Sequence, residues 1–366
     1  MLRIAIADIH LSEYKDDKSI ESLPRRLYDI KITLEKIIKF AKDNKIKNID
    51  ILGDIYHDKN IIYTDCQNLF KDIILSNSDI HFTIISGNHD LSSEGENQTS
   101  AIETLDILEN VTCVIKEPYK EENMVFVPYS NNFIEYLQDI EEYDILLSHF
   151  GVSEAVLQSG ISIRSNINMN DLKKFKLILL GHYHKPQEII KKTHKLYYIG
   201  SLIHHNWNDK NEQKRFIVYD TEKLEIESVP ITWITEFKEL ILENEEQQKL
   251  IFEQANILKE KGDIVRIRKK IDKISKEYQK DDLIIVDDIE EDLITNRGIT
   301  SNISHEEKFK KYLKYKNIED EKDVEKYLDI AFNIINGNYV FKDNAERKEN
   351  EISQTEEVLD LGEITL

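Results

Sequence analysis

Short apolar runs alternate with amphipathic stretches over the first 230 residues of the chain. The amphipathic stretches have the apolar spacing of helices and cover residues 24–44, 64–75, 98–110 and 131–141. The apolar runs have the length of buried strands and read LRIAIA, NIDILG, HFTIIS, MVFVP, DILLSH, KLILLG, LYYIG and RFIVYD. Because this alternation is typical of sheets covered by helices, it predicts an α/β fold, with a β-sandwich flanked by helices, for a first domain over residues 1–232.

The pattern changes beyond this domain, and no proline follows residue 230. Residues 233–294 predict a small α+β module. Its expected elements are a helix over 237–262, a strand over 263–270, a second helix over 271–280 and a second strand over 282–288.

Two short amphipathic helices are expected within residues 303–336. Two such helices cannot bury both of their apolar faces against each other, so we expect this segment to dock on a partner. The remaining residues, 337–366, are polar and acidic and are expected to form a flexible tail.

The composition narrows the class of protein. No apolar run approaches the roughly 20 residues needed to span a bilayer, and Asp8 interrupts the N-terminal run before a signal-peptide core could form. Only Cys66 and Cys113 occur, without the paired spacing of a zinc or redox site. We therefore expect a cytoplasmic protein with reduced thiols and no membrane association.

Polar side chains follow five of the apolar runs, at the point where each run ends. Because loops at the carboxyl ends of strands converge on a shared crevice in α/β sheets, we expect these side chains to meet in one site. Glycines among them allow the backbone to turn sharply beside a ligand. The residues are Asp8 and His10, then Gly53, Asp54 and His57, then Gly87, Asn88, His89 and Asp90, then His149, and finally Gly181, His182 and His184.

These residue types suit a pair of divalent cations. A carboxylate can bridge two ions about 3.5–4 Å apart, and such a pair can hold both the attacking and the leaving oxygen of a phosphoryl displacement. Imidazole with carboxylate and amide oxygens suits manganese or iron, and also zinc. Taken singly, each fragment has an ordinary explanation, such as a turn at Asp54 or a hydrogen-bonded core histidine at His149. Five fragments in this order favour the metal site.

The five fragments resemble the motifs of the calcineurin-like metallophosphoesterase superfamily, which are DxH, GDxx(D/H), GNH(D/E), a lone H, and GHxH. The resemblance covers residues 1 to about 230. It implies two metal ions, with manganese favoured and magnesium, iron or zinc as alternatives. It also implies the ligands: Asp8, His10, Asp54 and His184 for one ion, and Asp54, Asn88, His149 and His182 for the other, with Asp54 as the bridge.

The second motif, GDIYHD, resembles that of SbcD-type nucleases and lacks the arginine of the GDxxDRG motif in protein phosphatases. This resemblance implies a DNA exonuclease and endonuclease acting at DNA ends in repair, recombination or replication. It implies that His57 positions the substrate phosphate and that His89 protonates the leaving oxygen, supported by Asp90 or a neighbouring backbone group. His204 and His205 are expected to be loop residues near the site and not ligands.

The same resemblance implies partners. In this subfamily a helical pair grips the coiled coil of an SbcC-type ABC ATPase, and the nuclease is a homodimer within a heterotetramer. ATP binding is expected to belong to that partner, since no GxxxxGK[ST] motif occurs in this chain. The compact length suggests a bacterial or phage-encoded member.

A basic row in the small α+β module is a candidate DNA contact. Arg266, Arg268 and Lys270 alternate with apolar or other residues, which places them on one face of a strand. The alternative is an ordinary solvated strand face. The net charge of −21 opposes DNA binding, because affinity depends on neutralised phosphates. Many of the acidic residues lie at 281–292 and in the tail, away from the motifs, and bound cations would supply positive charge where the phosphate lies. Both points reduce the conflict.

Two other functions remain open at this point. One is a phosphatase or phosphodiesterase of the same superfamily that acts on small molecules or phosphoproteins, which would need neither the basic row nor the helical pair. The other is a non-catalytic scaffold, whose expected signature is the loss of ligands; every ligand of the motif set is present here.

Overall fold

The computed structural model describes residues 1–15, 17–93, 99–130, 133–138, 140, 143–156, 165–275, 278 and 283–287, together with five single positions beyond residue 300. The chain divides into two units, Met1–Asp287 and Asp288–Leu366. The helical pair expected within 303–336 lies outside the described residues except at five single positions, and the tail at 337–366 lies entirely outside them.

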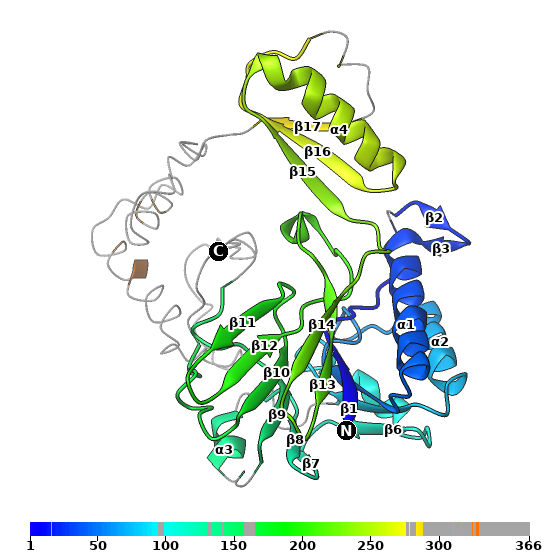
Figure 1. Ribbon diagram of the computed structural model, residues 1–366, viewed down its shortest axis with the longest axis vertical. Helices are drawn as coiled ribbons and strands as arrows, with labels where there is room; N and C mark the ends of the chain where they lie inside the picture. The colour runs from blue at the N-terminus through cyan, green and yellow to red at the C-terminus, as the bar shows by residue number, and fades with distance from the viewer. Residues whose placement is uncertain are drawn as a thin grey trace, which may run out of the picture. The chain divides into compact units, whose positions relative to one another are not determined.

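Two six-stranded sheets form the framework of the described residues (Figure 1). In the first sheet, four strands run parallel and two antiparallel strands extend one edge. Its order is β14 (Ile226–Pro230), β13 (Arg215–Asp220), β1 (Leu2–Ile6), β4 (Asn48–Leu52), β5 (His81–Ile85) and β6 (Val111–Val114).

The second sheet has four parallel central strands with an antiparallel strand at each edge. Its order is β11 (Gln187–Ile190), β12 (Lys195–Tyr198), β10 (Leu177–Gly181), β9 (Ile145–His149), β8 (Met124–Val127) and β7 (Tyr119–Glu121). Apolar side chains from both sheets share one buried cluster, which includes Ala5, Leu52, Phe126, Leu147 and Leu179. The two sheets therefore pack face to face, and the predicted α/β fold is confirmed.

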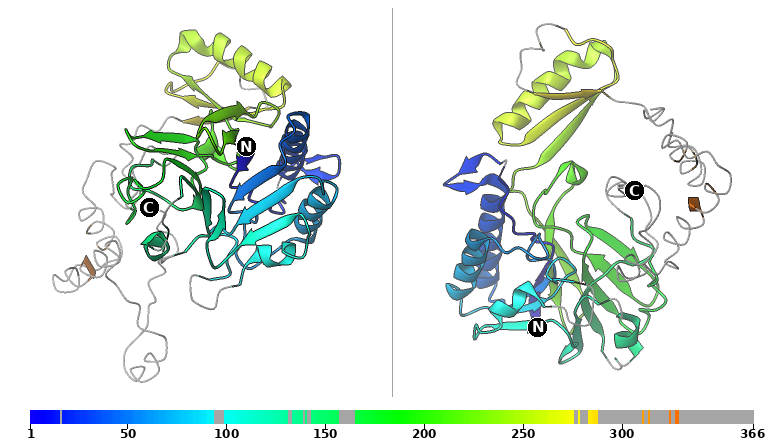
Figure 2. Two further views of the ribbon diagram at one scale, coloured as in Figure 1. Left: turned by 60° about the horizontal axis from the view of Figure 1, so that its bottom comes forward. Right: turned by 180° about the vertical axis from the view of Figure 1, so that it is seen from behind.

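Helices cover the outer faces of this sandwich, as the views from the side and from behind show (Figure 2). The helices α1 (Arg25–Asp43) and α2 (Thr64–Leu75) share a buried cluster with β1, β4 and β5 of the first sheet. On the second sheet, α3 (Phe133–Gln138) packs through Phe133 and Leu137. No helix among the described residues has the length and apolar character needed to cross a bilayer.

The helix predicted over 98–110 is wrong. Within that range lies only the short 3-10 helix η1 (Ala101–Leu105), capped by the Ser100 side chain. Only Ile102 and Leu105 of this helix are buried, so a single turn satisfies its apolar positions. Smaller elements of the domain are the hairpin β2 (Ser19–Ile20) and β3 (Leu23–Pro24) and the 3-10 helix η2 (Trp207–Asp209).

The small α+β module contains the parallel strands β15 (Phe237–Leu242), β16 (Ile264–Lys269) and β17 (Ile284–Asp287). The 3-10 helix η3 (Glu245–Gln247) and α4 (Gln248–Glu260) connect the first two strands. The expected single helix over 237–262 is therefore wrong in its first third, because FKELIL pairs with β16. Burial of Leu242 against Phe252 and Ile267 decides for the strand. The helix expected over 271–280 is wrong at residues 271–275, which form no helix, and most of its remaining residues lie outside the described ones.

A buried ion pair ties the first sheet together. Arg3 and Asp50 are both fully buried, with Nη2 to Oδ1 at 2.6 Å, and the Tyr219 hydroxyl donates to Asp50 Oδ2 at 2.6 Å. We expect Arg3→Met to lower the free energy of unfolding by about 3–5 kcal/mol, because it leaves an uncompensated buried carboxylate. Denaturant titration measures this. The exposed pair of Lys42 and Asp79 provides the control, since Lys42→Met should cost under about 1 kcal/mol. Equal small losses in both variants would contradict the prediction.

Candidate metal centre

The loops that follow β1, β4, β5, β9 and β10 meet at one edge of the sandwich. Backbone hydrogen bonds join the first two loops, from Asp8 N–H to Gly53 O at 3.1 Å and from His10 N–H to Asp54 O at 2.9 Å. The loop after β10 joins them through His182 N–H, which donates to Asp8 Oδ1 at 3.0 Å. The structure thus brings together side chains such as those of His10 and His184, which are 174 residues apart in sequence.

The first cation position is the group formed by Asp8, His10, Asp54 and His184. The ligand atoms of Asp8, His10 and His184 lie within 4.8 Å of one another. His10 Nε2 is 2.9 Å from His184 Nε2 and 3.5 Å from Asp54 Oδ2. Apart from His184, which is half-buried, these side chains are buried.

The second cation position is the group formed by Asp54, Asn88, His149 and His182. His149 Nε2 lies 3.3 Å from Asp54 Oδ2 and 3.2 Å from Asn88 Oδ1. Asn88 Oδ1 is also 3.1 Å from His182 Nδ1. Because the same Asp54 Oδ2 faces both His10 and His149, this carboxylate occupies the place of a bridging ligand.

The arrangement fits a cation pair. Two ligand atoms bound to one ion at about 2.1 Å, at angles of roughly 90–110°, lie about 3.0–3.4 Å apart, close to the 2.9–3.5 Å separations observed. The Nδ1–H of buried His149 donates to Leu52 O at 2.7 Å, which leaves the Nε2 lone pair facing two oxygens. A cation resolves this opposition of lone pairs. Nitrogen and oxygen ligands without sulfur suit manganese, iron or zinc.

Burial keeps three of the histidine ligands uncharged. Burial lowers the pKa of His182 to about 3 and that of His184 to about 4, and it holds the pKa of His10 well below its usual value. These rings therefore offer lone pairs near neutral pH. Without a bound cation, burial opposes charge on His149, yet the charge of Asp54 raises the pKa of His149 to about 9.

Close packing explains the glycines of the motifs. A Cβ on Gly53 would collide with the His149 ring, one on Gly87 with Asp54, and one on Gly181 with Leu52 O. Gly53 also has a φ of +83°. The ligands Asp8, His10 and Asp54 have φ values of 52°, 51° and 55°. Such left-handed non-glycine residues persist only where the surrounding structure fixes them.

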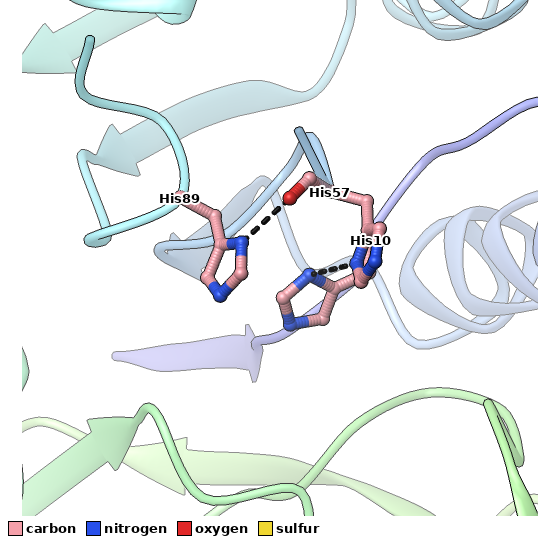
Figure 3. A group of neighbouring side chains, drawn as sticks. All are labelled: His10, His57 and His89. Carbon is pink, nitrogen blue, oxygen red and sulfur yellow. Dashed lines mark hydrogen bonds between the residues drawn. The ribbon is translucent and has the colours of Figure 1, made fainter. Parts of the chain in front are cut away.

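Asp90 does not support His89, which was one of the two roles predicted from the sequence. Within the described part of the chain, its carboxylate accepts hydrogen bonds from the backbone N–H groups of Asp54, Ile55, Tyr56 and Gly87 at 2.8–3.1 Å. The support of His89 is instead a backbone group, since His89 Nδ1 donates to His57 O at 2.6 Å (Figure 3). Asp90 is therefore a positioning residue that fixes the Asp54 loop, and its expected contact with His89 is corrected.

His57 connects His89 to the first cation position. Its Nδ1 is 3.4 Å from His10 Nδ1 (Figure 3). Because His10 Nε2 faces the cation position, His10 Nδ1 carries the proton and donates to His57 Nδ1. His57 then presents Nε2–H as a donor. The rings of His57 and His89 are stacked, with centroids 5.6 Å apart. With His10 they form a third group of possible ligand atoms within 4.8 Å of one another, beside the two four-residue groups.

The sequence match agrees with this geometry. The family model of the calcineurin-like phosphoesterases matches residues 1–219. The chain belongs to the calcineurin-like phosphoesterase family. As a member of this dimetal family, it is a metal-dependent phosphoester hydrolase, and the Asp and His groups described above could hold its metal ions.

Similar solved structures are distant. They include a novel archaeal phosphodiesterase, at 13% identity and a TM-score of 0.35, covering 63% of this chain and 100% of that chain. A hypothetical protein of Pyrococcus horikoshii has 14% identity and a TM-score of 0.36, covering 70% and 93%. GAP50, the anchor in the inner membrane complex of Plasmodium, has 12% identity and a TM-score of 0.37, covering 63% and 89%. No curated protein matches the chain.

The basic row of the small module is paired within this phosphoesterase. Arg266 and Arg268 both bind Glu239 on β15, and Arg268 Nη2 does so at 3.1 Å. Lys270 Nζ lies 3.7 Å from Glu243 Oε1. Arg266 also stacks over the Trp207 ring at 4.2 Å. Acidic neighbours thus compete with any phosphate for this row, and its contact with DNA stays a prediction.

The loop histidines occupy two different places. His204 Nδ1 accepts from Phe237 N–H at 3.1 Å, and its Nε2–H donates to Glu212 O at 2.9 Å, so it ties β15 to the segment before β13. The His205 ring contacts the backbone of Asp8, with Nε2 at 3.4 Å from Asp8 O, and belongs to neither group of ligand atoms. Sequence reasoning missed Tyr14, whose hydroxyl donates to His10 O at 2.5 Å, because a loop tyrosine carries no motif.

Proposed function

We propose that this phosphoesterase is a DNA nuclease that hydrolyses phosphodiester bonds at DNA ends. The observation that carries the proposal is the pair His57 and His89 beside the two cation positions. In place of the arginine of the protein-phosphatase motif, the loop after β4 presents His57 with a donor Nε2–H and holds His89 through its carbonyl. A diester needs a proton on its leaving sugar oxygen, and His89 is placed to supply one.

The cations, His57 and His89 have separate tasks in this reaction. When bound, the cations neutralise charge on the phosphoryl oxygens and activate a water. His57 Nε2–H donates to a phosphate oxygen and orients the scissile bond. His89 keeps its Nδ1–H on the His57 carbonyl and, as the imidazolium, passes the proton on Nε2 to the departing oxygen, which leaves a neutral ring. All these contacts are to phosphate, which carries no base identity, so cleavage is independent of sequence.

The test compares substrates. The purified full chain, loaded with Mn²⁺, should degrade linear duplex or hairpin DNA and turn over a generic phosphomonoester only weakly. Metal chelation should abolish both activities. Vigorous phosphomonoester turnover without DNA cleavage would instead support a small-molecule or protein phosphatase. Failure of any turnover by a chain that binds two Mn²⁺ equivalents would support the scaffold.

We also propose that the chain acts with an SbcC-type coiled-coil ATPase, through the amphipathic segment at 303–336. The two apolar stripes of that segment support the proposal, since they need a surface to cover them. A chain ending at residue 295 should lose capture of the ATPase in a pull-down and keep two Mn²⁺ equivalents as its folding control. Retained capture would remove the role given to the segment.

A further inference from the structure

The backbone carbonyl groups of three cation ligands are contacted by buried or half-buried polar side chains from other parts of the chain. All three belong to the group assigned to the first cation position, where Asp54 is the shared fourth ligand; the Asp8 carboxylate also lies within 4.8 Å of the ligand atoms of Asp54 and His149. The contacts are Tyr14 Oη to His10 O at 2.5 Å, Lys214 Nζ to His184 O at 3.0 Å, and His205 Nε2 to Asp8 O at 3.4 Å.

The three side chains are joined to one another. Tyr14 Oη lies 3.2 Å from His205 Nδ1, and in either tautomer the His205 ring donates one hydrogen bond into this group. Lys214, which is fully buried, binds Asp209 Oδ1 at 2.7 Å. Asp209 Oδ2 in turn accepts from His205 N–H at 3.0 Å. Arg26 closes the group by stacking on the Tyr14 ring at 4.4 Å. We name Tyr14, His205, Lys214, Asp209 and Arg26 the carbonyl-holding cluster.

A hydrogen bond to a backbone carbonyl has its largest effect on side-chain direction where the backbone conformation is strained. Asp8 and His10 both have φ values near 50°, a conformation that costs about 1–3 kcal/mol for a non-glycine residue. The orientation of each peptide group sets the direction of the attached side chain. The Tyr14 hydroxyl binds the carbonyl oxygen of His10, and the one N–H of the His205 ring goes either to Tyr14 Oη or to the carbonyl oxygen of Asp8. The cluster thereby fixes where these two ligands present their side chains.

The second cation position is held in another way. His149 is oriented through its own ring, since Nδ1–H donates to Leu52 O at 2.7 Å. Asn88 Oδ1 faces the rings of His149 and His182 at 3.2 and 3.1 Å. The two positions therefore share Asp54 but differ in what supports their remaining ligands.

We propose that Tyr14, His205 and Lys214 are positioning residues that set the affinity of the first cation position separately from that of the second. The proposal depends on the two-cation centre and holds whatever phosphoester is cleaved. Loss of one supporting hydrogen bond of this kind typically lowers metal affinity by about 10–100-fold. That loss should fall on one ion of the pair.

Tyr14→Phe is the sharpest test, because it removes one oxygen and keeps the ring under Arg26. In calorimetric titration with Mn²⁺, one equivalent should weaken by about 10–100-fold and the other should keep its wild-type affinity. At one to two equivalents, the electron paramagnetic resonance signal of the coupled manganese pair should give way to that of a single ion. The thermal midpoint of the metal-free variant should stay close to wild type.

Tyr136→Phe is the matched control, since the Tyr136 hydroxyl also donates to a backbone carbonyl, Lys116 O, at 2.6 Å, and lies outside the cluster. It should bind both equivalents normally. His205→Leu, tested independently, should reproduce the selective loss. The proposal is overturned if Tyr14→Phe binds both ions with wild-type affinity, or if both affinities fall equally, which would show general support of the site.

Discussion

We expect Asp54→Ala to remove both cations and to lower phosphoester hydrolysis by at least about a thousand-fold. The reason is the position of Asp54 Oδ2, which lies 3.5 Å from His10 Nε2 and 3.3 Å from His149 Nε2 and so serves both cation positions. Charge neutralisation by such ions is worth several kcal/mol in the transition state, and about 4 kcal/mol corresponds to a thousand-fold change in rate. Metal analysis after dialysis, together with kcat/KM, measures the two losses.

The side chain of Asp54 also holds the neighbouring loop, because Oδ1 accepts from His89 N–H at 2.8 Å. Asp54→Asn separates the two effects, since an amide can keep that acceptor while losing the bridging charge. It should lose the cations as the alanine variant does. Asp72→Ala, at an exposed position on α2, is the control and should keep full metal content. Two retained Mn²⁺ equivalents in Asp54→Asn would show that the carboxylate charge is not required.

His89→Ala should lower kcat by about 10²–10⁴-fold while both Mn²⁺ equivalents remain bound. The ring of His89 is oriented by the His57 carbonyl at 2.6 Å. It lies with His10 and His57 in a third group of possible ligand atoms and outside the two four-residue groups assigned to the cation positions. Its expected role is to protonate the leaving oxygen. The loss should therefore be large on DNA and much smaller on an aryl phosphodiester, whose leaving group departs without a proton.

His81→Ala controls for removal of an imidazole, because the His81 ring contacts Thr112 Oγ1 at 3.0 Å at the other end of β5. It should change neither substrate appreciably. Equal losses of His89→Ala on DNA and on the aryl diester would contradict proton donation. Loss of one metal equivalent in His89→Ala would assign the ring to a cation position instead.

Much of the fold could be predicted from the chain because buried strands leave a local trace. Each run such as NIDILG or KLILLG is buried except at its first, polar residue and ends in a polar turn. The carboxyl ends of parallel strands meet at one sheet edge, so convergence of the ligands followed from strand order alone. Local pattern failed where it was ambiguous. FKELIL has helix-forming residues, but pairing with β16 outweighs that preference.

The amino-acid sequence by itself determined which ligand types exist, their order along the chain, and the α/β class, since these depend on residue identity and short-range periodicity. Only the tertiary structure decided which atoms meet. It placed Asp54 Oδ2 between two histidines, gave His89 a backbone partner in place of Asp90, paired Arg268 with Glu239, and brought Tyr14 to His205 across 191 positions. Such contacts join residues far apart in the chain, and their geometry depends on packing that no local pattern encodes.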